Sequence, residues 1–335
     1  MLPGDYLAFK FSGDATTTLS GLSEGIFWNF HKDTIAKSLL EAYDIDENMI
    51  PEMVNTFSVQ SQVSKKGAEE SGLLAGTPIL YRAGDQPNNA LSLNVFHPGE
   101  VAATAGTSGV MYAVTDNLSA KECDRVNNFA HVNYGHGGKK YIGKLLCING
   151  AGIQYRWLLN NLSVSSYEEM NQLASEIEVG SDGVCLIPFG NGAERILLNQ
   201  DVGTRIANLN LNMHDKGHLC RAALEGIAFS FVYGFEIMQK DGIIPKVIRA
   251  GNDNLFRSEI FANTIATLIQ KEIEIYNTTG AIGAARACTL KNGDFDKFSS
   301  FMGNDHLMTF MPFKDVEPYK LAYQRWKEEL ELILK

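Results

Sequence analysis

Residues 76–114 read GTPILYRAGDQPNNALSLNVFHPGEVAATAGTSGVMYAV, and this stretch decides the fold class. Its first apolar run, residues 78–81, predicts a short buried strand, and Asp85 follows at the carboxyl end of that strand. Residues 100–114 predict two further strands joined by a Gly-Thr-Ser-Gly turn, in which Gly106 and Gly109 would supply the positive φ angles of a tight hairpin. A carboxylate after one strand and a glycine-flanked Thr-Ser pair after another therefore lie close together in the sequence.

The alternation of strand, glycine-containing turn and helix continues toward the C-terminus. Residues 144–148 predict a strand that leads into a helix with Trp157 in the core, and residues 246–249 predict another that leads into an apolar helix. Residues 215–239 predict a long, largely buried helix. This order is typical of a mixed α/β protein. In open α/β sheets ligands lie beyond the carboxyl ends of the strands, so the turns there are expected to hold nucleotide and substrate.

Composition and charge exclude several classes of function. The chain has 335 residues, 45% of them hydrophobic, which is enough for the cores of two domains. Its net charge is −10 and no run of Lys or Arg forms a basic stripe, so we expect no nucleic-acid partner. No signal peptide or membrane span is predicted, which favours a cytoplasmic protein without a membrane partner. The five Cys and seven His lack ligand spacing, so no protein-only metal site is expected.

The quoted segment contains side chains that suit phosphoryl transfer. That reaction needs positioned phosphates, a metal ion and a base that takes the proton of the acceptor hydroxyl. Asp85 is the candidate base, Gln86 is a candidate for binding sugar hydroxyls, and the backbone N–H groups of Gly106, Thr107 and Ser108 are candidates for holding the transferred phosphate. Spacing alone also allows simpler interpretations, because an aspartate after a strand is commonly a turn residue and the turn itself an ordinary hairpin.

The segment resembles the region of FGGY carbohydrate kinases that carries an AGD triplet and a GTSG turn, here residues 83–85 and 106–109. The resemblance covers nearly the whole chain. It implies the two-lobe, actin-like (ribonuclease-H-like) α/β ATPase fold, with residues 1–98 as the remainder of the first, sugar-binding lobe and residues 99–335 as the second, nucleotide-binding lobe. Similar motifs are DYL at 5–7, SEG at 23–25, PFGNGAER at 188–195, HLCRAALEG at 218–226 and GAIGAARA at 280–287.

The resemblance assigns roles to individual residues. Asp85 would be the general base, Gln86 would contact the sugar, and the Gly106, Thr107 and Ser108 turn would contact the γ-phosphate of ATP, with Mg²⁺ as the metal. The adenosine would lie at Gly251, Asn252 and Asn254. Within the family the quoted segment is most similar to the xylulokinase subgroup, which implies phosphorylation of D-xylulose to D-xylulose 5-phosphate. Kinases for L-fuculose, L-rhamnulose or glycerol, and a nucleotide-binding fragment without catalysis, are the alternatives.

Some family features are replaced or absent. The family's first strand carries a DxGT phosphate loop, and no such segment precedes Asp5, so we expect the chain to begin part-way through the first lobe. Residues 201–204 spell DVGT, but they fall within the second lobe. Ala250 stands where the adenosine loop commonly has glycine. The expected partner is a small-molecule sugar, and the expected assembly is a monomer or a homodimer.

Overall fold

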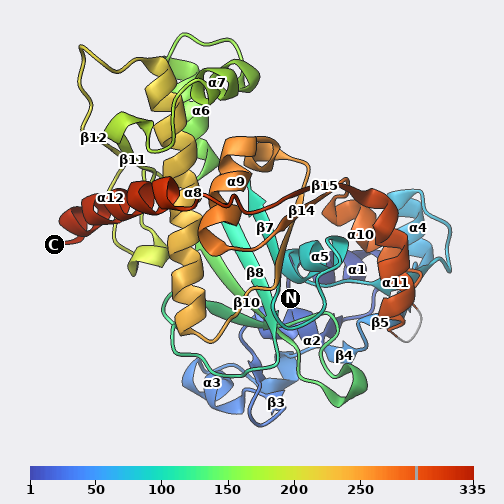
Figure 1. Cartoon of the computed structure of the whole chain (residues 1–335). Coiled ribbons are helices and arrows are strands. Elements are labelled where there is room, and N and C mark those ends of the chain that lie inside the picture. The colour runs from blue at the N-terminus through green and yellow to red at the C-terminus, as the bar shows by residue number, and fades with distance from the viewer. Residues whose placement is uncertain (291–292) are drawn as a thin grey trace.

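A seven-stranded mixed sheet forms the centre of the protein (Figure 1), whose computed structural model describes residues 1–290 and 293–335. The strand order is β15-β14-β13-β7-β8-β10-β9. Strand β13 runs parallel to both β7 and β14, whereas the other neighbouring pairs are antiparallel. The strands are β7 (Glu100–Ala105), β8 (Gly109–Thr115), β9 (Asn127–Ala130), β10 (Ile142–Ile148), β13 (Val247–Gly251), β14 (Ile273–Tyr276) and β15 (His306–Phe310).

The predicted hairpin is present at the middle of this sheet. Strands β7 and β8 pair from Val101↔Ala113 to Ala105↔Gly109, which leaves three residues, Gly106, Thr107 and Ser108, in the turn. Positive φ angles were expected to explain the glycines at positions 106 and 109, but neither Gly106 nor Gly109 has a positive φ angle. A Cβ at Gly109 would lie 2.6 Å from the ring of Phe231, so packing requires this glycine.

Helices cover both faces of the sheet, and the alternation of side chains along β7 and β8 shows which face meets which helix. Ala103, Ala105 and Met111 share a core with Phe231 of α8 (Lys216–Lys240) and Phe261 of α9 (Glu259–Ile269). On the opposite face, a smaller core joins strand residues to α5 (Asp85–Ser92) and the loop that follows it. Its members are Ala90, Leu93, Val95, Ala102, Tyr112, Val114, Phe129, Leu145 and Tyr276.

Helix α5, which begins at the candidate base, is held against α10 (Gly280–Ala287). The Asn88 side-chain amide donates a hydrogen bond to the Gly280 carbonyl at 3.0 Å. Gly283 allows the two helices to approach closely, because a Cβ there would lie 2.2 Å from the Cβ of Ser92. The position of Asp85 is therefore fixed by packing against the larger sheet and against the second half of the chain.

The first 98 residues form small sheets and short helices instead of a large core. Strand β1 pairs in parallel with β4, β2 pairs with β3, and β5 pairs with β6. The expected strand at 78–81 is β6, but its side chains are partly exposed, not buried. The elements are α1 (Pro3–Ser12), β1 (Thr16–Thr18), α2 (Leu19–Glu24), β2 (Trp28–Asn29), β3 (Thr34–Ile35), α3 (Lys37–Ala42), η1 (Glu47–Met49), β4 (Glu52–Val54), β5 (Phe57–Gln62), α4 (Lys65–Ser71) and β6 (Pro78–Tyr81).

The remaining elements surround the sheet, with α6, α7, β11 and β12 at one end of α8 in Figure 1. Trp157 on α6 is 55% exposed, so its predicted place in the core is wrong. No helix in the described part of the chain is long and apolar enough to cross a bilayer. These elements are α6 (Gly152–Asn161), α7 (Tyr167–Ser175), β11 (Cys185–Ile187), β12 (Arg205–Ala207), α11 (Phe295–Met302), α12 (Glu317–Leu334), η2 (His136–Gly138), η3 (Ser181–Gly183), η4 (Arg195–Leu197), η5 (Asn254–Arg257) and η6 (Gly303–Asp305).

Candidate functional site

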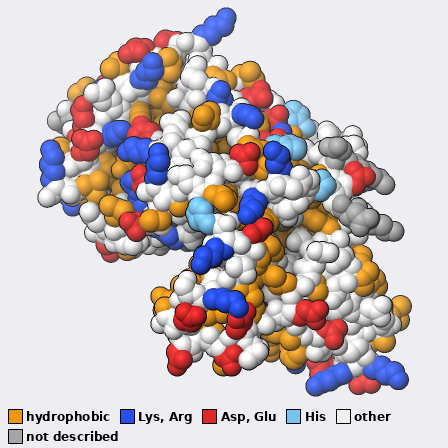
Figure 2. Space-filling model, turned by 90° about the horizontal axis from the view of Figure 1, so that it is seen from below, with side chains coloured by type: hydrophobic (Ala, Val, Ile, Leu, Met, Phe, Trp, Pro, Cys, Tyr) orange, Lys and Arg blue, Asp and Glu red, His pale blue; other side chains and the backbone are white. Residues whose placement is uncertain are grey.

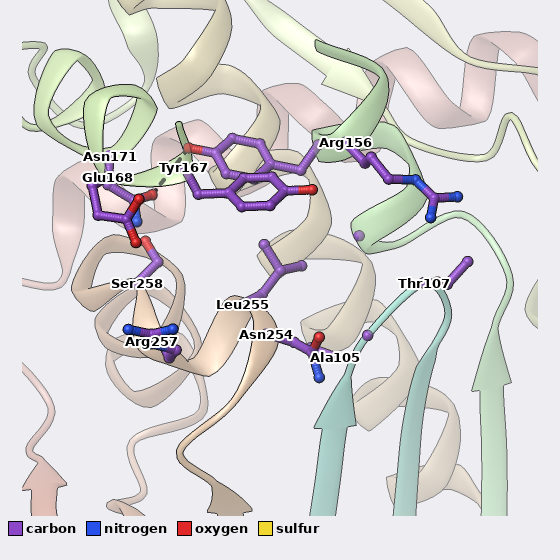
Figure 3. A pocket seen from close by; sticks show the side chains of 13 residues that line it. Ala105, Thr107, Arg156, Tyr167, Glu168, Asn171, Asn254, Leu255, Arg257 and Ser258 are labelled. Carbon is purple, nitrogen blue, oxygen red and sulfur yellow. Dashed lines mark hydrogen bonds between the residues drawn. The ribbon is translucent and has the colours of Figure 1, made fainter. Parts of the chain in front are cut away.

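A pocket of about 330 Å³ opens beside the turn between β7 and β8. Gly106 and Thr107 of the turn line it together with α6, α7 and the 3₁₀ segment η5 (Figure 3). Tyr167 lies across the pocket from Leu255 and Asn254. The full lining is Ala105, Gly106, Thr107, Gly152, Tyr155, Arg156, Tyr167, Glu168, Asn171, Asn254, Leu255, Arg257 and Ser258.

Aromatic and polar groups on opposite sides of this pocket suit a flat polar ligand. The rings of Tyr155 and Tyr167 stack with centroids 5.7 Å apart, and the Tyr155 hydroxyl donates to the Asn171 side-chain oxygen at 3.0 Å. Ser258 is buried, and its hydroxyl has no hydrogen-bond partner within the described residues. A buried polar group without a partner is uncommon and points to a ligand or water in the cavity.

The N-terminus of α6 is held directly against the β7–β8 turn. The Gly152 amide donates to the Gly106 carbonyl at 2.9 Å, and the Ile153 amide donates to the Thr107 carbonyl at 3.1 Å. The buried Glu194 carboxylate accepts hydrogen bonds from the amides of Asn149 (2.8 Å) and Gly150 (2.6 Å), which fixes the loop that leads into α6. Glu194 thus has a structural role.

The structure brings three of the six predicted nucleotide and phosphate residues into this pocket. Gly106, Thr107 and Asn254 line it, and Asn254 adopts a φ of 47° that turns the chain between β13 and α9. Ser108 is exposed in the turn but does not line the pocket. Gly251 is buried at the end of β13 and Asn252 is exposed beside it, and neither lines the pocket. Nucleotide contact by all six residues stays a prediction.

Asp85 and Gln86 lie at the start of α5, and Asp85, but not Gln86, lines a second cavity. The Asp85 carboxylate is exposed and accepts hydrogen bonds from the Gln86 backbone amide at 2.8 Å and the Gln86 side-chain amide at 3.0 Å. Burial raises the pKa of the Cys147 thiol on β10, Arg195 opposes this shift, and the negative charge of Asp85 adds to it. Since Cys147 pairs with Val110 of β8, the candidate base is near the strand that follows the glycine turn.

Arg82 precedes Asp85 by three residues, which from sequence predicts that it either orients this carboxylate or forms an exposed ion pair, and the structure shows neither. It is only 8% exposed. Its Nε donates to the Asp5 carboxylate at 2.8 Å, and its Nη2 donates to the Thr16 hydroxyl at 2.6 Å. Asp5 also accepts from the Thr17 hydroxyl at 2.8 Å. Arg82 therefore connects the residues before α5 to α1 and β1.

Glu24, at the end of α2, faces the residue before Asp85. Burial, followed by the negative charges of Asp85 and Asp5, raises the pKa of the Glu24 carboxyl from 4.5 to about 7. Gly84 makes this approach possible, because a Cβ there would lie 1.6 Å from a carboxylate oxygen of Glu24. The sequence contained one indication of this residue, the SEG stretch, but nothing in it pointed to a carboxyl beside Asp85.

Replacing Glu24 by glutamine is expected to stabilise the fold at pH 8 but not at pH 5.5. The folded-state pKa is raised to about 7, so the folded protein binds the proton more tightly than the unfolded chain, and stability falls as pH rises from about 4.5 to about 7. Glutamine removes this loss, which we place at about 1–2 kcal/mol after allowing for solvent screening. Urea unfolding at both pH values measures it. An equal effect at the two pH values would contradict the explanation.

Residues of α6 and α7 that line the first pocket were missed by sequence reasoning. Tyr155, Arg156, Tyr167 and Asn171 have no motif of their own, and aromatic residues at helical spacing usually indicate core packing.

Over the face shown in Figure 2, Lys and Arg side chains are interspersed with Asp and Glu and form no basic stripe, which agrees with the net charge of −10.

Comparison with known proteins identifies similar chains over almost the whole length. The profile of the FGGY family of carbohydrate kinases matches twice, with its N-terminal domain at residues 1–92 and its C-terminal domain at residues 101–290. A xylulose kinase of Haemophilus influenzae is 24% identical over 340 residues, which cover 98% of this chain and 67% of that protein. A gluconokinase of Bacillus subtilis is 26% identical and covers 81% of this chain and 54% of that protein.

Solved structures show the same fold. The structure of Plasmodium falciparum glycerol kinase with ADP superposes with a TM-score of 0.87 at 19% sequence identity, covering 99% of this chain and 66% of that chain. The chain thus spans between about half and about two thirds of the length of the proteins that it matches.

Proposed function

The chain belongs to the FGGY family of carbohydrate kinases, and from this membership we propose that it acts in the ATP-dependent phosphorylation of a ketose. Its mixed α/β architecture is the actin-like ATPase fold of those kinases. The observation that carries the proposal is the pocket built from the β7–β8 turn, the N-terminus of α6 and η5. Backbone N–H groups of the glycine turn are suited to phosphate, and the stacked tyrosines border a space for a flat base.

The proposed chemistry assigns one role to each group. Asp85 takes the proton of the acceptor hydroxyl as that oxygen attacks the γ-phosphorus, and the bond from phosphorus to the β,γ-bridging oxygen of ATP breaks. Two hydrogen bonds from Gln86 hold the Asp85 carboxylate in place, and its exposure leaves it accessible to substrate. Amide groups of the Gly106 to Ser108 turn would stabilise the negative charge on the transferred phosphoryl group.

Mg²⁺ would enter this site with the nucleotide. Across residues 1–290 and 293–335, no three His, Cys, Asp or Glu side chains gather into a group able to hold a metal ion. Mg²⁺ that accompanies ATP commonly keeps several waters and is held through the phosphates, whose charge it neutralises, and one or two carboxylates.

The similarity to a xylulose kinase supports D-xylulose as acceptor, with the C5 hydroxyl as the attacking group and D-xylulose 5-phosphate as product. The test is ADP release with Mg-ATP and a panel of D-xylulose, L-fuculose, L-rhamnulose, glycerol and D-gluconate. We expect D-xylulose to give the highest kcat/KM. Sugar-independent hydrolysis, or a preference for another acceptor, would contradict the proposed substrate.

The pocket beside the glycine turn shares no residue with the cavity at Asp85, so nucleotide binding without phosphoryl transfer is the alternative function. Calorimetric titration with ADP together with the ADP-release measurement separates the two functions. Binding without turnover on any sugar supports the second function, whereas turnover on a sugar supports the first.

Gly152→Ala is expected to weaken ADP binding at least tenfold, about 1.4 kcal/mol. A Cβ at Gly152 would lie 2.3 Å from the Gly106 carbonyl oxygen, so α6 and the glycine turn must separate to accommodate it. Calorimetric titration with ADP measures the effect. Gly303→Ala is the matched control, because a Cβ at Gly303 meets no atom within 4 Å. Equal affinity of both variants would show that the pocket does not hold the nucleotide.

A further inference from the structure

The second cavity, of about 440 Å³, shares no residue with the pocket beside the glycine turn. It is bounded by the start of α1, by α2 and by the loop that leads into α5. Asp85, the proposed base, lies on its border, so a molecule bound here is next to the group that would accept its proton. The lining is Leu2, Pro3, Gly4, Asp5, Thr18, Gly21, Glu24, Arg82, Ala83, Gly84 and Asp85.

Arg82 provides this cavity with an unused hydrogen-bond donor. The side chain is 8% exposed, and Nε and Nη2 donate to Asp5 and Thr16. The third nitrogen, Nη1, is buried and has no partner within the described residues. Leaving a buried donor unpaired is unfavourable, more so when the donor is charged, so this nitrogen favours an acceptor atom supplied by a ligand or water.

Glu24 provides the matching acceptor. Its Oε1 is buried and also lacks a partner within the described residues. No ion pair joins Glu24 to Arg82 in the described part of the chain, where Arg82 pairs with Asp5. Two residues that line the cavity thus each have one buried polar atom without a described partner, a donor in Arg82 and an acceptor in Glu24. A hydroxyl group accepts one hydrogen bond and donates another, so a polyol satisfies both.

The charges around the cavity distinguish between kinds of sugar. Three carboxyl groups line it, Asp5, Glu24 and Asp85, against one guanidinium, that of Arg82. Tyr81 and Tyr112 also interact electrostatically with Glu24, but they add no charge near pH 7 because burial raises the pKa of both hydroxyls. An acceptor with its own carboxylate therefore meets an excess of negative charge, which a neutral sugar does not.

We propose that Glu24 and Arg82 bind hydroxyl groups of a neutral polyol acceptor, and that Glu24 makes the cavity select against sugar acids such as aldonates. The selectivity rests on the proposed function in one respect, that the molecule beside Asp85 is the phosphoryl acceptor. Binding itself is independent of catalysis and is measured without nucleotide. Glu24 is a specificity-determining residue, and Gly84 is required for its carboxylate to reach this place.

The test is calorimetric titration of the whole chain with D-xylulose and with D-gluconate. We expect D-gluconate to bind at least tenfold more weakly than D-xylulose at pH 8, and by a smaller ratio at pH 6, where Glu24 is largely protonated. Glu24→Gln keeps the shape and the acceptor oxygen but removes the charge. It is expected to lower the gluconate-to-xylulose ratio of dissociation constants at least fivefold at pH 8 and to abolish its pH dependence.

Glu69→Gln on α4 is the matched control, because Glu69 is exposed and lies outside the cavity. An unchanged ratio in Glu24→Gln, tighter binding of D-gluconate by the unmodified chain, or binding of neither sugar overturns the inference. Failure of the proposed function gives a different result. If Glu24→Gln changes the gluconate-to-xylulose ratio of dissociation constants but no sugar is phosphorylated, the inference holds and the kinase function does not. If D-xylulose is phosphorylated but this ratio does not change in Glu24→Gln, the kinase function holds and the inference does not.

Discussion

Asp85→Asn is expected to lower kcat for sugar phosphorylation by about 10²–10⁴-fold, the usual contribution of a general base. Asparagine has nearly the shape of aspartate and retains an oxygen that accepts the hydrogen bond from the Gln86 amide, 2.8 Å away in the parent protein. It does not accept the proton of the attacking hydroxyl. Because Asp85 lies outside the pocket beside the glycine turn, ADP affinity should change less than twofold. ADP release measures the first effect and calorimetry the second.

Asp116→Asn is the control for this substitution. Asp116 is also exposed, but it follows the far end of β8 and lines neither cavity. Its variant should retain the parent rate. If Asp85→Asn were as active as Asp116→Asn, then Asp85 would be a helix-start residue and not a base, which is the simpler interpretation that its position after a strand also allows.

The glycine turn shows how much of this protein's fold the local sequence predicts. The hairpin, its two strands and the following buried helices were predicted because alternation and helical periodicity are local properties. The reason for Gly109 was not, because the atom that excludes a side chain there belongs to Phe231 of α8. Such contacts between distant parts of the chain leave no trace in the spacing of nearby residues.

The candidate site was predicted unevenly for the same reason. The family resemblance selected Gly106, Thr107 and Asn254, which lie in one pocket. Arg82 was assigned to its neighbour in sequence, yet its partner Asp5 precedes it by 77 residues. A charged residue next to a candidate base indicates little until the fold shows which of its neighbours it meets.

Lys144→Met is expected to lower the free energy of unfolding by about 3–5 kcal/mol, the usual cost of leaving a buried charge without its partner. Lys144 on β10 and Asp241 after α8 are 0% and 1% exposed. The ammonium donates to the Asp241 carboxylate, to the Asp241 carbonyl at 3.0 Å and to the Ser119 carbonyl. Methionine fills the space but leaves the Asp241 carboxylate in the core without an opposite charge. Denaturant unfolding measures the change.

Asp241, the partner of Lys144, has a second role that makes the double variant informative. Asp241 also accepts hydrogen bonds from the amides of Lys121 (2.6 Å) and Glu122 (3.1 Å), and asparagine retains one oxygen for them. Lys144→Met combined with Asp241→Asn removes both charges, so it should recover much of the lost stability. Lys140→Met is the matched control, because its pair with Asp33 is exposed and contributes less than about 1 kcal/mol. If Lys144→Met cost no more than Lys140→Met, the buried pair would not be what joins β10 to the end of α8.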